Sequence, residues 1–306
     1  MAKPKVIVIC GPTASGKTAL SIELAKQING EIVSADSMQI YEKMDIGTAK
    51  PDKEEMDGIK HYLIDCVSPE IRYSVATYKN DAIQAIQEII QKGKMPIVVG
   101  GTGLYVDSLI YGIEYEEIEI DLEYRKQLEQ TVQEQGLNVL YEQALKIDPK
   151  AMEKISCNDK KRICRILEIY HSTGKTKTEQ EIESRKKEIP YDYKVFAINM
   201  DREKLYNRIN IRVDKMIQNG LINEVEQLIK QYKNIPTALQ GLGYKEVVDY
   251  LNGECTKEEA VEKIKMETRR YAKRQITWFK KNKQTIWLDG LNDRQNNINI
   301  ILEGIK

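Results

Sequence analysis

Short apolar runs alternate with amphipathic segments through the first third of the chain. Four runs have the length and composition of buried strands: residues 6–10, 31–33, 61–65 and 96–99. Between them, apolar residues recur at helical spacing over 19–25 and 77–92. Strands that alternate with helices favour a parallel sheet, because the crossover helices cover both of its faces. We therefore expect an α/β core.

The pattern changes near residue 114. A stretch without helical periodicity comes first, and its acids are Glu114, Glu116, Glu117, Glu119, Asp121 and Glu123. Helical segments follow near 121–135, 137–146, 159–172 and 176–187. The next strand-like run is 195–198, after which the pattern is helical from 201 to about 283 and 285–288 fits a final strand. We predict a helical insertion domain, 115–190, within a core formed by 1–114 and 191–306.

Composition limits the class of protein. The 306 residues carry a formal net charge of zero, so a nucleic-acid surface would have to be a local patch. The five cysteines lack CxxC spacing, and with only His61 and His171 beside them they give no zinc pattern and indicate a reducing compartment. No apolar run approaches membrane-spanning length, and the first strand begins too early for a signal peptide. We expect a soluble, cytoplasmic protein and take it to be a monomer.

The segment Gly-Pro-Thr-Ala-Ser-Gly-Lys-Thr, residues 11–18, joins the first strand to the first helix. This is the pattern of a phosphate-binding loop (P-loop), in which glycines let backbone N–H groups surround a phosphate and the helix N-terminus adds partial positive charge. Lys17 would reach the terminal phosphates, and the Thr18 hydroxyl would help to hold Mg²⁺, the one cofactor we expect. The motif predicts binding of a diphosphate or triphosphate. Alone, it leaves kinase, ATPase and transferase open.

The ends of two other strands narrow the chemistry. Nucleotide-hydrolysing P-loop proteins usually carry an acidic residue after a second apolar strand, but here 96–99 runs directly into Gly-Gly-Thr. The acidic residue instead follows the run 31–33, as Asp36. Carboxyl ends of parallel strands face the ligand crevice, so Asp36 and Thr102 should converge on what the loop holds. This arrangement suits a base that activates an acceptor beside a diphosphate leaving group.

Four segments, in this order and spacing, resemble the tRNA dimethylallyltransferase (tRNA isopentenyl-transferase) family: GPTASGKT at 11–18, ADSMQIYEKMDIGTAKP at 35–51, VVGGTGLY at 98–105 and AKRQITWF at 272–279. The resemblance implies a prenyltransferase that moves a dimethylallyl group from dimethylallyl diphosphate to N6 of an adenine. That adenine lies immediately 3′ of the anticodon in tRNAs that read codons beginning with U. The family fold is a P-loop core with a helical insertion domain, and the tRNA and the donor enter a channel from opposite ends.

The resemblance also assigns the catalytic residues. Asp36 corresponds to the general base, Thr102 to the threonine beside the scissile allyl oxygen, and Arg212, with Lys17, to the cations that stabilise the departing diphosphate. The residues expected to bind the donor diphosphate rather than ATP, although weak nucleotide binding stays open, are Gly11, Thr13, Ala14, Ser15, Gly16, Lys17 and Thr18. Capping of a turn or helix is the alternative role for Asp36 and Thr102. Arg208 is the competitor of Arg212, one helical turn away.

The tRNA contacts implied by the resemblance fall on both predicted domains. In the core they are Asp36, Ser37, Met38, Gln39, Thr102, Gly243, Tyr244 and Lys245. In the insertion they are Arg125 and the basic residues of the segment 159–165, namely Lys161, Arg162 and Arg165. The segment 263–283 adds nine basic residues against the single acid Glu267. Such a run is often a solvated helix face, but within this family pattern it favours RNA binding.

Three other functions compete with tRNA prenylation. A prenyltransferase acting on free adenine nucleotides would need neither an RNA-gripping insertion nor a basic C-terminal helix. A P-loop small-molecule kinase is disfavoured by the missing carboxylate after Val99. A non-catalytic RNA-binding protein would leave the intact phosphate loop unexplained.

Overall fold

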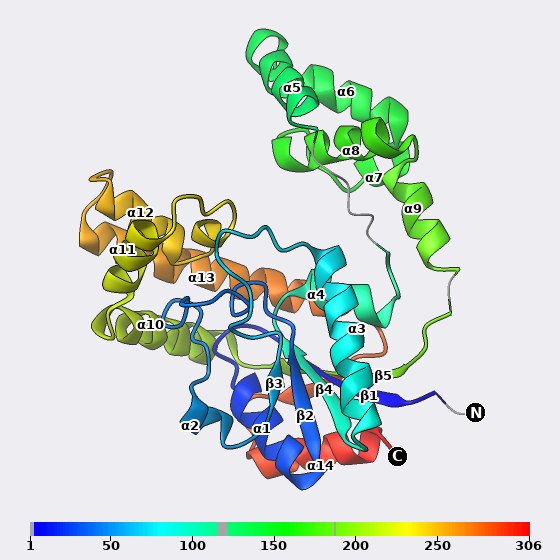
Figure 1. Cartoon of the computed structure of the whole chain (residues 1–306), viewed down its shortest axis with the longest axis vertical. Coiled ribbons are helices and arrows are strands. Elements are labelled where there is room, and N and C mark those ends of the chain that lie inside the picture. The colour runs from blue at the N-terminus through cyan, green and yellow to red at the C-terminus, as the bar shows by residue number, and fades with distance from the viewer. Residues whose placement is uncertain (1–2, 115–120, 187) are drawn as a thin grey trace. The chain divides into compact units, whose positions relative to one another are not determined.

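The structure is a computed structural model that describes residues 3–114, 121–186 and 188–306 (Figure 1). Six strands form one sheet in the order β3-β2-β4-β1-β5-β6, and every neighbouring pair is parallel. Their bounds are β1 Lys5–Cys10, β2 Gly30–Ser34, β3 His61–Tyr62, β4 Met95–Gly100, β5 Asp192–Asn199 and β6 Ile286–Asp289. The predicted parallel α/β core is confirmed.

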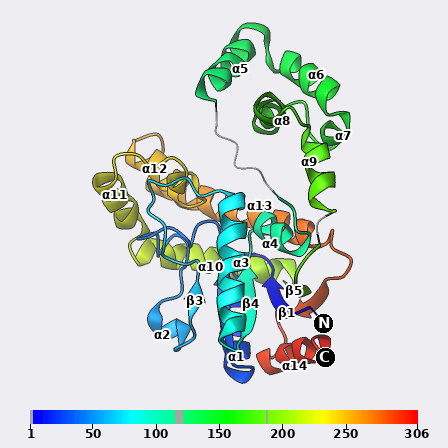
Figure 2. The same cartoon turned by 45° about the vertical axis from the view of Figure 1, so that its right-hand side comes forward.

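Helices cover both faces of this sheet, as Figures 1 and 2 show. The helices of the core are α1 Lys17–Gln27, α2 Lys53–Met56, α3 Val75–Gln91, α4 Gly103–Ile110, α10 Arg202–Gln218, α11 Leu221–Gln231, α12 Tyr244–Leu251, α13 Lys257–Phe279 and α14 Arg294–Gly304, with a 3₁₀ turn at Ala238–Gln240. Side chains alternate along β1: Val6 and Val8 pack with residues of α3 and α4, whereas Ile7 and Ile9 pack with residues of α1 and α14. The strand is buried on both faces, which explains its uninterrupted apolar run.

A third apolar cluster joins the helices α10 to α13 to the segment after β2. Ile40 and Met44 of that segment pack against Val213 of α10, Val225 of α11 and Tyr244 of α12. This cluster holds the segment that follows Asp36 against the helical part of the core. It therefore fixes one wall of the candidate site.

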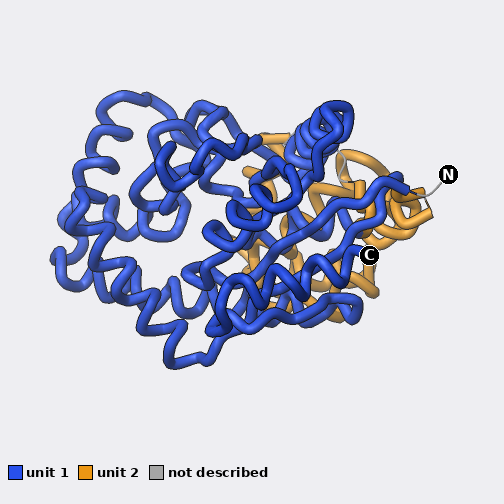
Figure 3. The backbone as a smooth tube through the Cα atoms, turned by 90° about the horizontal axis from the view of Figure 1, so that it is seen from below, with its two compact units in different colours: residues 1–110, 190–306 blue, residues 111–189 orange. Residues whose placement is uncertain are grey.

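The chain divides into two compact units, coloured separately in Figure 3. Unit 1 comprises 1–110 and 190–306, and unit 2 comprises 111–189. The helices of unit 2 are α5 Leu122–Gln135, α6 Leu137–Ile147, α7 Pro149–Met152, α8 Lys160–Thr173 and α9 Lys177–Ser184. Leu128, Leu140, Met152, Ile163 and Ile166 form its own buried core. The predicted insertion was 115–190, and its role in gripping tRNA stays a prediction.

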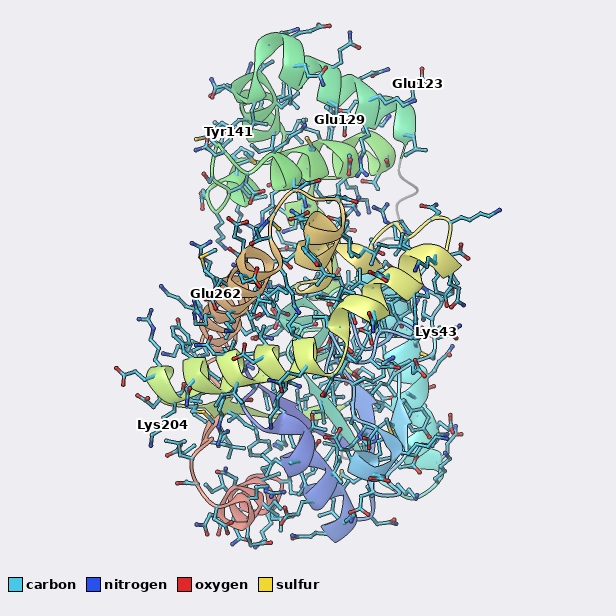
Figure 4. All side chains as sticks on the ribbon, turned by 90° about the vertical axis from the view of Figure 1, so that its left-hand side faces the viewer. Lys43, Glu123, Glu129, Tyr141, Lys204 and Glu262 are labelled. Carbon is cyan, nitrogen blue, oxygen red and sulfur yellow. The ribbon has the colours of Figure 1, made fainter. Side chains whose placement is uncertain are left out.

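Several local expectations differ from the structure. The strand expected over 61–65 is limited to His61–Tyr62, because Leu63 and Asp65 have φ values of +57° and +52°, outside the extended region. The short helix α7 and the C-terminal helix α14 were not predicted. Of the acidic stretch, Glu116, Glu117 and Glu119 lie outside the described residues, whereas Glu123 is exposed on α5 (Figure 4).

Candidate active site

A cavity of about 360 Å³ lies at the carboxyl ends of the central strands. The phosphate loop after β1, the segment after β2 and the end of β4 each contribute to its lining, and α10 and α13 close the other side. Among its lining residues are Thr13, Lys17, Thr18, Asp36, Ser37, Met38, Gln39 and Arg212. The structure therefore places part of the residues expected for the donor on one cavity with those expected at the acceptor base. Of the other residues predicted for the diphosphate, Ala14, Ser15 and Gly16 line a second cavity, and Gly11 is in neither lining.

The phosphate loop has the backbone of an anion-binding turn. Gly16 lies at φ +91° directly before α1, a conformation that favours glycine, so the loop N–H groups lead into the helix N-terminus. Ser15 is 3% exposed, and its hydroxyl has no hydrogen-bond partner among the described residues. A buried hydroxyl without a partner costs free energy unless a ligand satisfies it. Ser15 therefore fits an anion-binding role.

The Thr13 N–H is not available to a phosphate in this loop. It donates to the Gln275 side chain at 2.9 Å, and the Thr13 hydroxyl accepts from Arg212 at 3.4 Å. The N–H groups that can face a ligand therefore begin after Thr13. Sequence reasoning placed Thr13 among the diphosphate-binding residues; in this structure its N–H and its hydroxyl both have protein partners, Gln275 and Arg212.

Two cations of the cavity are desolvated. Burial lowers the pKa of Lys17 to about 8; the Asp36 carboxylate opposes this shift and the Arg212 charge adds to it. Burial also lowers the pKa of Arg212, again against the effect of Asp36. The Lys17 ammonium donates to the Pro12 carbonyl at 2.7 Å. In the described part of the chain neither cation forms an ion pair with a carboxylate, which leaves both available to a diphosphate.

The phosphate loop also lines a second cavity, of about 440 Å³. Lys17, Thr18 and Arg212 line both cavities, whereas Arg208 lines only this second one and is exposed. The two candidate arginines are thus distinguished by position. Arg212 reaches the region where the loop and Asp36 meet, and Arg208 lies outside it.

Asp36 combines its expected position with the alternative role of a turn cap. Its Oδ1 accepts from the Met38 N–H at 2.9 Å and from the Gln39 N–H at 3.3 Å. These bonds hold the carboxylate in one orientation at the cavity wall and engage Oδ1, not Oδ2. Capping and base catalysis are compatible, because a fixed carboxylate still presents its second oxygen.

Thr102 lies just before α4, but its hydroxyl does not cap that helix. The hydroxyl accepts from the Ser37 N–H at 3.0 Å and lies 3.3 Å from the Ser37 hydroxyl. Gly100 and Gly101 line the cavity, while Thr102 is absent from the described lining. In this structure Thr102 therefore ties the end of β4 to the segment that carries Asp36.

The residues expected to hold the target base have protein partners of their own. The Gln39 amide donates to the carbonyls of Thr48 and Ala49, at 3.1 and 3.2 Å. Tyr244 is 1% exposed and donates its hydroxyl to Glu224 at 2.7 Å, although its side chain also lines the cavity. Gly243 opens α12, and Lys245 on that helix is exposed.

Glu224, which sequence reasoning missed, anchors the loop over the cavity. Its carboxylate accepts from the backbone N–H groups of Asp45, Ile46 and Gly47, at 2.9, 2.7 and 3.1 Å. Together with Tyr244 it fixes the segment that contributes Gly47 and Thr48 to the lining. No local sequence pattern predicts this role of Glu224, because its hydrogen-bond partners lie far away in the sequence.

Tyr271 and Gln275 of α13 also line the cavity without having been predicted. Burial, followed by the nearby Asp36 charge, raises the pKa of the Tyr271 phenol to about 12, so the hydroxyl stays protonated at neutral pH. Both residues belong to the face that also carries Ile264 and Thr268. The helical spacing of these residues was the signal that could have pointed to Tyr271 and Gln275, and Gln275 also lies within the segment 272–279 that resembles the family.

The basic run 263–283 is partly neutralised by neighbouring groups. Lys263 pairs with Asp249 at 2.9 Å, Lys265 with Asp214 at 2.8 Å, and Arg270 with Glu267 at 2.6 Å. Figure 4 shows Glu262 on the same helix. Part of the positive charge of this run is thus compensated, and Arg274 lines the cavity.

In unit 2, the predicted tRNA contacts cluster around α8. Arg125 and Arg165 both approach Glu168, whose side chain is buried, at 2.6 and 3.5 Å. Arg162 pairs with Asp159 at 2.8 Å, and Lys161 is exposed. Two arginines on one buried glutamate leave a net positive charge at this surface.

The expected Mg²⁺ would find few protein ligands. Among the described residues no group of three or more His, Cys, Asp or Glu side chains could hold a metal. Thr18 lines both cavities, and a magnesium ion often binds through substrate phosphates and water with one or two protein oxygens. The residues present fit an ion that arrives with a diphosphate.

No helix in the described ranges combines the length and the apolar composition needed to cross a membrane.

The fold and the cavity define a P-loop-like α/β protein in which Asp36 lines one cavity together with Lys17 and Arg212. A family model described as IPP transferase matches residues 39–282. A tRNA dimethylallyltransferase of Acetivibrio thermocellus is 55% identical over 93% of this chain and 91% of its own, and one of Bacillus cereus is 47% identical over 94% and 90%. The chain belongs to the IPP transferase family, so the resemblance inferred from its four segments is confirmed.

Solved structures agree with this assignment. A tRNA isopentenylpyrophosphate transferase from Bacillus halodurans has a TM-score of 0.74 and 42% identity, covering 99% of this chain and 97% of its own. A eukaryotic dimethylallyltransferase acting on tRNA has a TM-score of 0.80 at 32% identity, covering 99% of this chain and 79% of its own. The P-loop-like core and the helical additions are therefore shared across the family.

Proposed function

We propose that this protein transfers the dimethylallyl group of dimethylallyl diphosphate to N6 of the adenine 3′-adjacent to the anticodon, in tRNAs that read codons beginning with U. The observation that carries the proposal is the meeting of Asp36 with Lys17 and Arg212 on one cavity. Relatives that cover nearly the whole chain are named tRNA dimethylallyltransferase. Because the acceptor is tRNA, we propose that the enzyme is cytoplasmic. We also propose that it acts as a monomer.

The donor diphosphate binds the phosphate loop. The groups that hold it are the backbone N–H groups from Ala14 to Thr18, the Ser15 hydroxyl, and the side chains of Lys17 and Arg212. Gly11 and Gly16 adopt the positive φ values that the turn requires. Desolvated cations bind a multivalent anion strongly, because little water remains to compete. Mg²⁺ held by Thr18 and the phosphate oxygens would neutralise further negative charge on the diphosphate.

The reaction forms one bond and breaks one. The N6 nitrogen of the adenine bonds to the allylic carbon, and the bond from that carbon to the diphosphate oxygen breaks. The diphosphate leaves with the bonding electron pair, and Lys17 and Arg212 stabilise the charge that grows on it. Asp36 accepts the proton released by the amine, a contribution of about 10²–10⁴-fold for a positioned base.

The acceptor base must leave its stack to reach Asp36. Flipping costs a few kcal/mol and is least expensive in a single-stranded loop, which is where proteins read RNA sequence. We propose that Ser37 and Met38 contact the base at the cavity wall. The side chains proposed to contact the RNA backbone are Arg125, Lys161, Arg162, Arg165 and Lys245, on α5, α8 and α12.

Two alternatives receive less support. A nucleotide-prenylating enzyme or a small-molecule kinase is named by neither the family model nor the curated relatives described above. A kinase is also disfavoured because this chain has Gly100, Gly101 and Thr102, and no acidic residue, at the end of β4. Prenylation of tRNA is the function that the site supports best.

The proposal is tested on cellular tRNA. Bulk tRNA from cells with and without the gene would be digested and its nucleosides identified by mass spectrometry. We expect N6-dimethylallyladenosine, or a product built on it, to disappear without the gene and to return with a plasmid copy. An unchanged nucleoside profile would contradict the proposed reaction.

A further inference from the structure

The Gln275 side chain bridges the two halves of the cavity. Its Oε1 accepts from the Thr13 N–H at 2.9 Å, and its Nε2 donates to the Gly101 carbonyl at 2.9 Å. Thr13 belongs to the phosphate loop after β1, and Gly101 follows β4. One buried carboxamide therefore connects the phosphate loop to the end of β4, which lies directly before Thr102.

The bridge is built into the packing around it. Gln275 is 5% exposed, so its amide meets little competition from water. A Cβ added at Gly101 would lie 2.2 Å from the Gln275 amide nitrogen, closer than real contacts allow. Glycine at 101 thus gives the amide room to approach the backbone, and the contact has a fixed geometry.

The contacts continue on both sides of this amide. On the donor side, the Thr13 hydroxyl accepts from Arg212 at 3.4 Å. On the acceptor side, Thr102 follows Gly101 and its hydroxyl accepts from the Ser37 N–H at 3.0 Å, next to Asp36. An unbroken series of contacts therefore runs from an arginine at the diphosphate site to the segment of the catalytic carboxylate.

We propose that Gln275 is a positioning residue of the transfer reaction, which sets the distance and orientation between the phosphate loop and the acceptor side of the cavity. The inference rests on the proposed function, since it assigns the two sides to donor and acceptor. An amide suits the role because one end must accept and the other must donate. Neither a hydrocarbon nor a carboxylate of the same size can make both bonds.

This requirement gives a test with its own signature. In Gln275→Glu, a protonated carboxyl can accept from Thr13 and donate to Gly101, as the amide does, but a carboxylate must repel the Gly101 carbonyl. Burial raises the pKa of such a carboxyl above its ordinary value of about 4.3. Lowering the pH should therefore restore the bridge. Gln275→Met keeps the size of the side chain but makes neither bond at any pH.

The experiment measures single-turnover dimethylallyl transfer to an anticodon stem-loop by wild type, Gln275→Glu and Gln275→Met between pH 6 and 9, roughly the range over which a raised carboxyl pKa would matter. At saturating donor, we expect Gln275→Met to lose about tenfold or more of the rate, because misplaced reactants react slowly. The ratio of Gln275→Glu to wild type should rise as the pH falls, while the Gln275→Met ratio stays level.

Each outcome has one meaning. A wild-type protein without transfer activity contradicts the proposed function rather than this inference. An active wild type overturns the positioning role if Gln275→Met is as fast as wild type, or if Gln275→Glu is as fast as wild type at the upper end of the pH range, where its carboxyl is ionised. If Gln275→Met melts at a much lower temperature, binding of the stem-loop by fluorescence anisotropy separates the cases: affinity close to that of wild type leaves the rate loss to positioning, whereas an equal loss of affinity overturns it.

Discussion

The cations of the cavity and those of unit 2 differ in how their charge is compensated. Lys17 and Arg212 are desolvated and, within the described residues, donate to a carbonyl and to a hydroxyl. Arg125, Arg162 and Arg165 each have a carboxylate partner instead. The first pair suits a small multivalent anion that displaces water, and the second set suits a large polyanion that is held by many weak, salt-sensitive contacts.

This difference teaches where each kind of specificity arises. Burial disfavours the charged form of a cation without a paired carboxylate, as the lowered pKa of Lys17 shows, and a bound multivalent anion would offset that cost. A surface arginine with a partner costs little and contributes little by itself. We therefore expect a single substitution to weaken donor binding strongly. The affinity for RNA should instead be the sum of small contributions from many residues.

Removal of the Asp36 carboxylate should give the largest effect. Asp36→Asn keeps the Oδ1 that accepts from Met38 but loses the base, so we expect the single-turnover rate to fall by about 10²–10⁴-fold. Donor affinity should hold or improve, because a negative charge near Lys17 is gone. Quench-flow kinetics and equilibrium binding of the donor measure the two quantities, and a near wild-type rate would remove Asp36 from the mechanism.

Removal of the Lys17 ammonium should come next. Lys17→Ala loses a charge that strengthens as the leaving group departs, and we expect kcat/KM for the donor to fall by about 10²–10³-fold. The Kd for an anticodon stem-loop should stay within about twofold, because RNA contacts lie elsewhere and add in small steps. Equal losses for donor and RNA, together with a lowered melting temperature, would indicate a damaged fold instead.

The pKa of Lys17 predicts a pH dependence of donor binding. Because the pKa in the free protein is about 8, Lys17 is protonated below that pH and loses its charge as the pH rises above it. Between about pH 7 and 8, where the terminal phosphate of the donor is already ionised, the affinity for dimethylallyl diphosphate should be nearly level, and above pH 8 it should fall by up to about tenfold per pH unit. In Lys17→Arg the guanidinium stays charged, so titration calorimetry of this variant should give a level profile. The same downturn in both proteins would assign it to another group.

Charge reversal in unit 2 should have the smallest effect. Arg162→Glu should raise the apparent KM for the stem-loop severalfold and reduce the magnitude of the salt slope of binding by about one, since one phosphate contact is lost. Donor affinity should not change. Lys126→Glu, an exposed reversal on α5 outside the proposed contacts, is the matched control. If both variants behave alike, the α8 surface has no special part in RNA binding.

The sequence predicted best what is encoded locally. The phosphate loop and Asp36 lie at strand ends that their own flanking residues specify, and the structure places both on one cavity. The strand expected over 61–65 failed because Leu63 and Asp65 adopt positive φ, which no apolar run reports. The short helix α7 has too few residues for periodicity to show.

What the sequence could not predict is the pairing of distant side chains. Gln275 meets Thr13, 262 residues earlier in the chain, and Glu224 holds backbone groups near Gly47, 177 residues earlier. A glutamine on an amphipathic helix gives no sign of such a partner, because the fold alone brings the two together. Gln39 was missed over a shorter separation: its amide N–H donates to the carbonyl of Thr48, 9 residues later in the chain.

The acceptor is the central claim, and one comparison tests it most directly. Purified protein would be incubated with dimethylallyl diphosphate and Mg²⁺ together with either an anticodon stem-loop carrying the target adenine or free AMP, and products would be followed by mass spectrometry under single-turnover conditions. A single-stranded loop lets the base flip into the cavity while the RNA backbone meets the basic surfaces, which AMP cannot do. We predict that the stem-loop gains one dimethylallyl group and AMP gains none. Prenylation of AMP at a rate equal to that of the stem-loop would contradict the account.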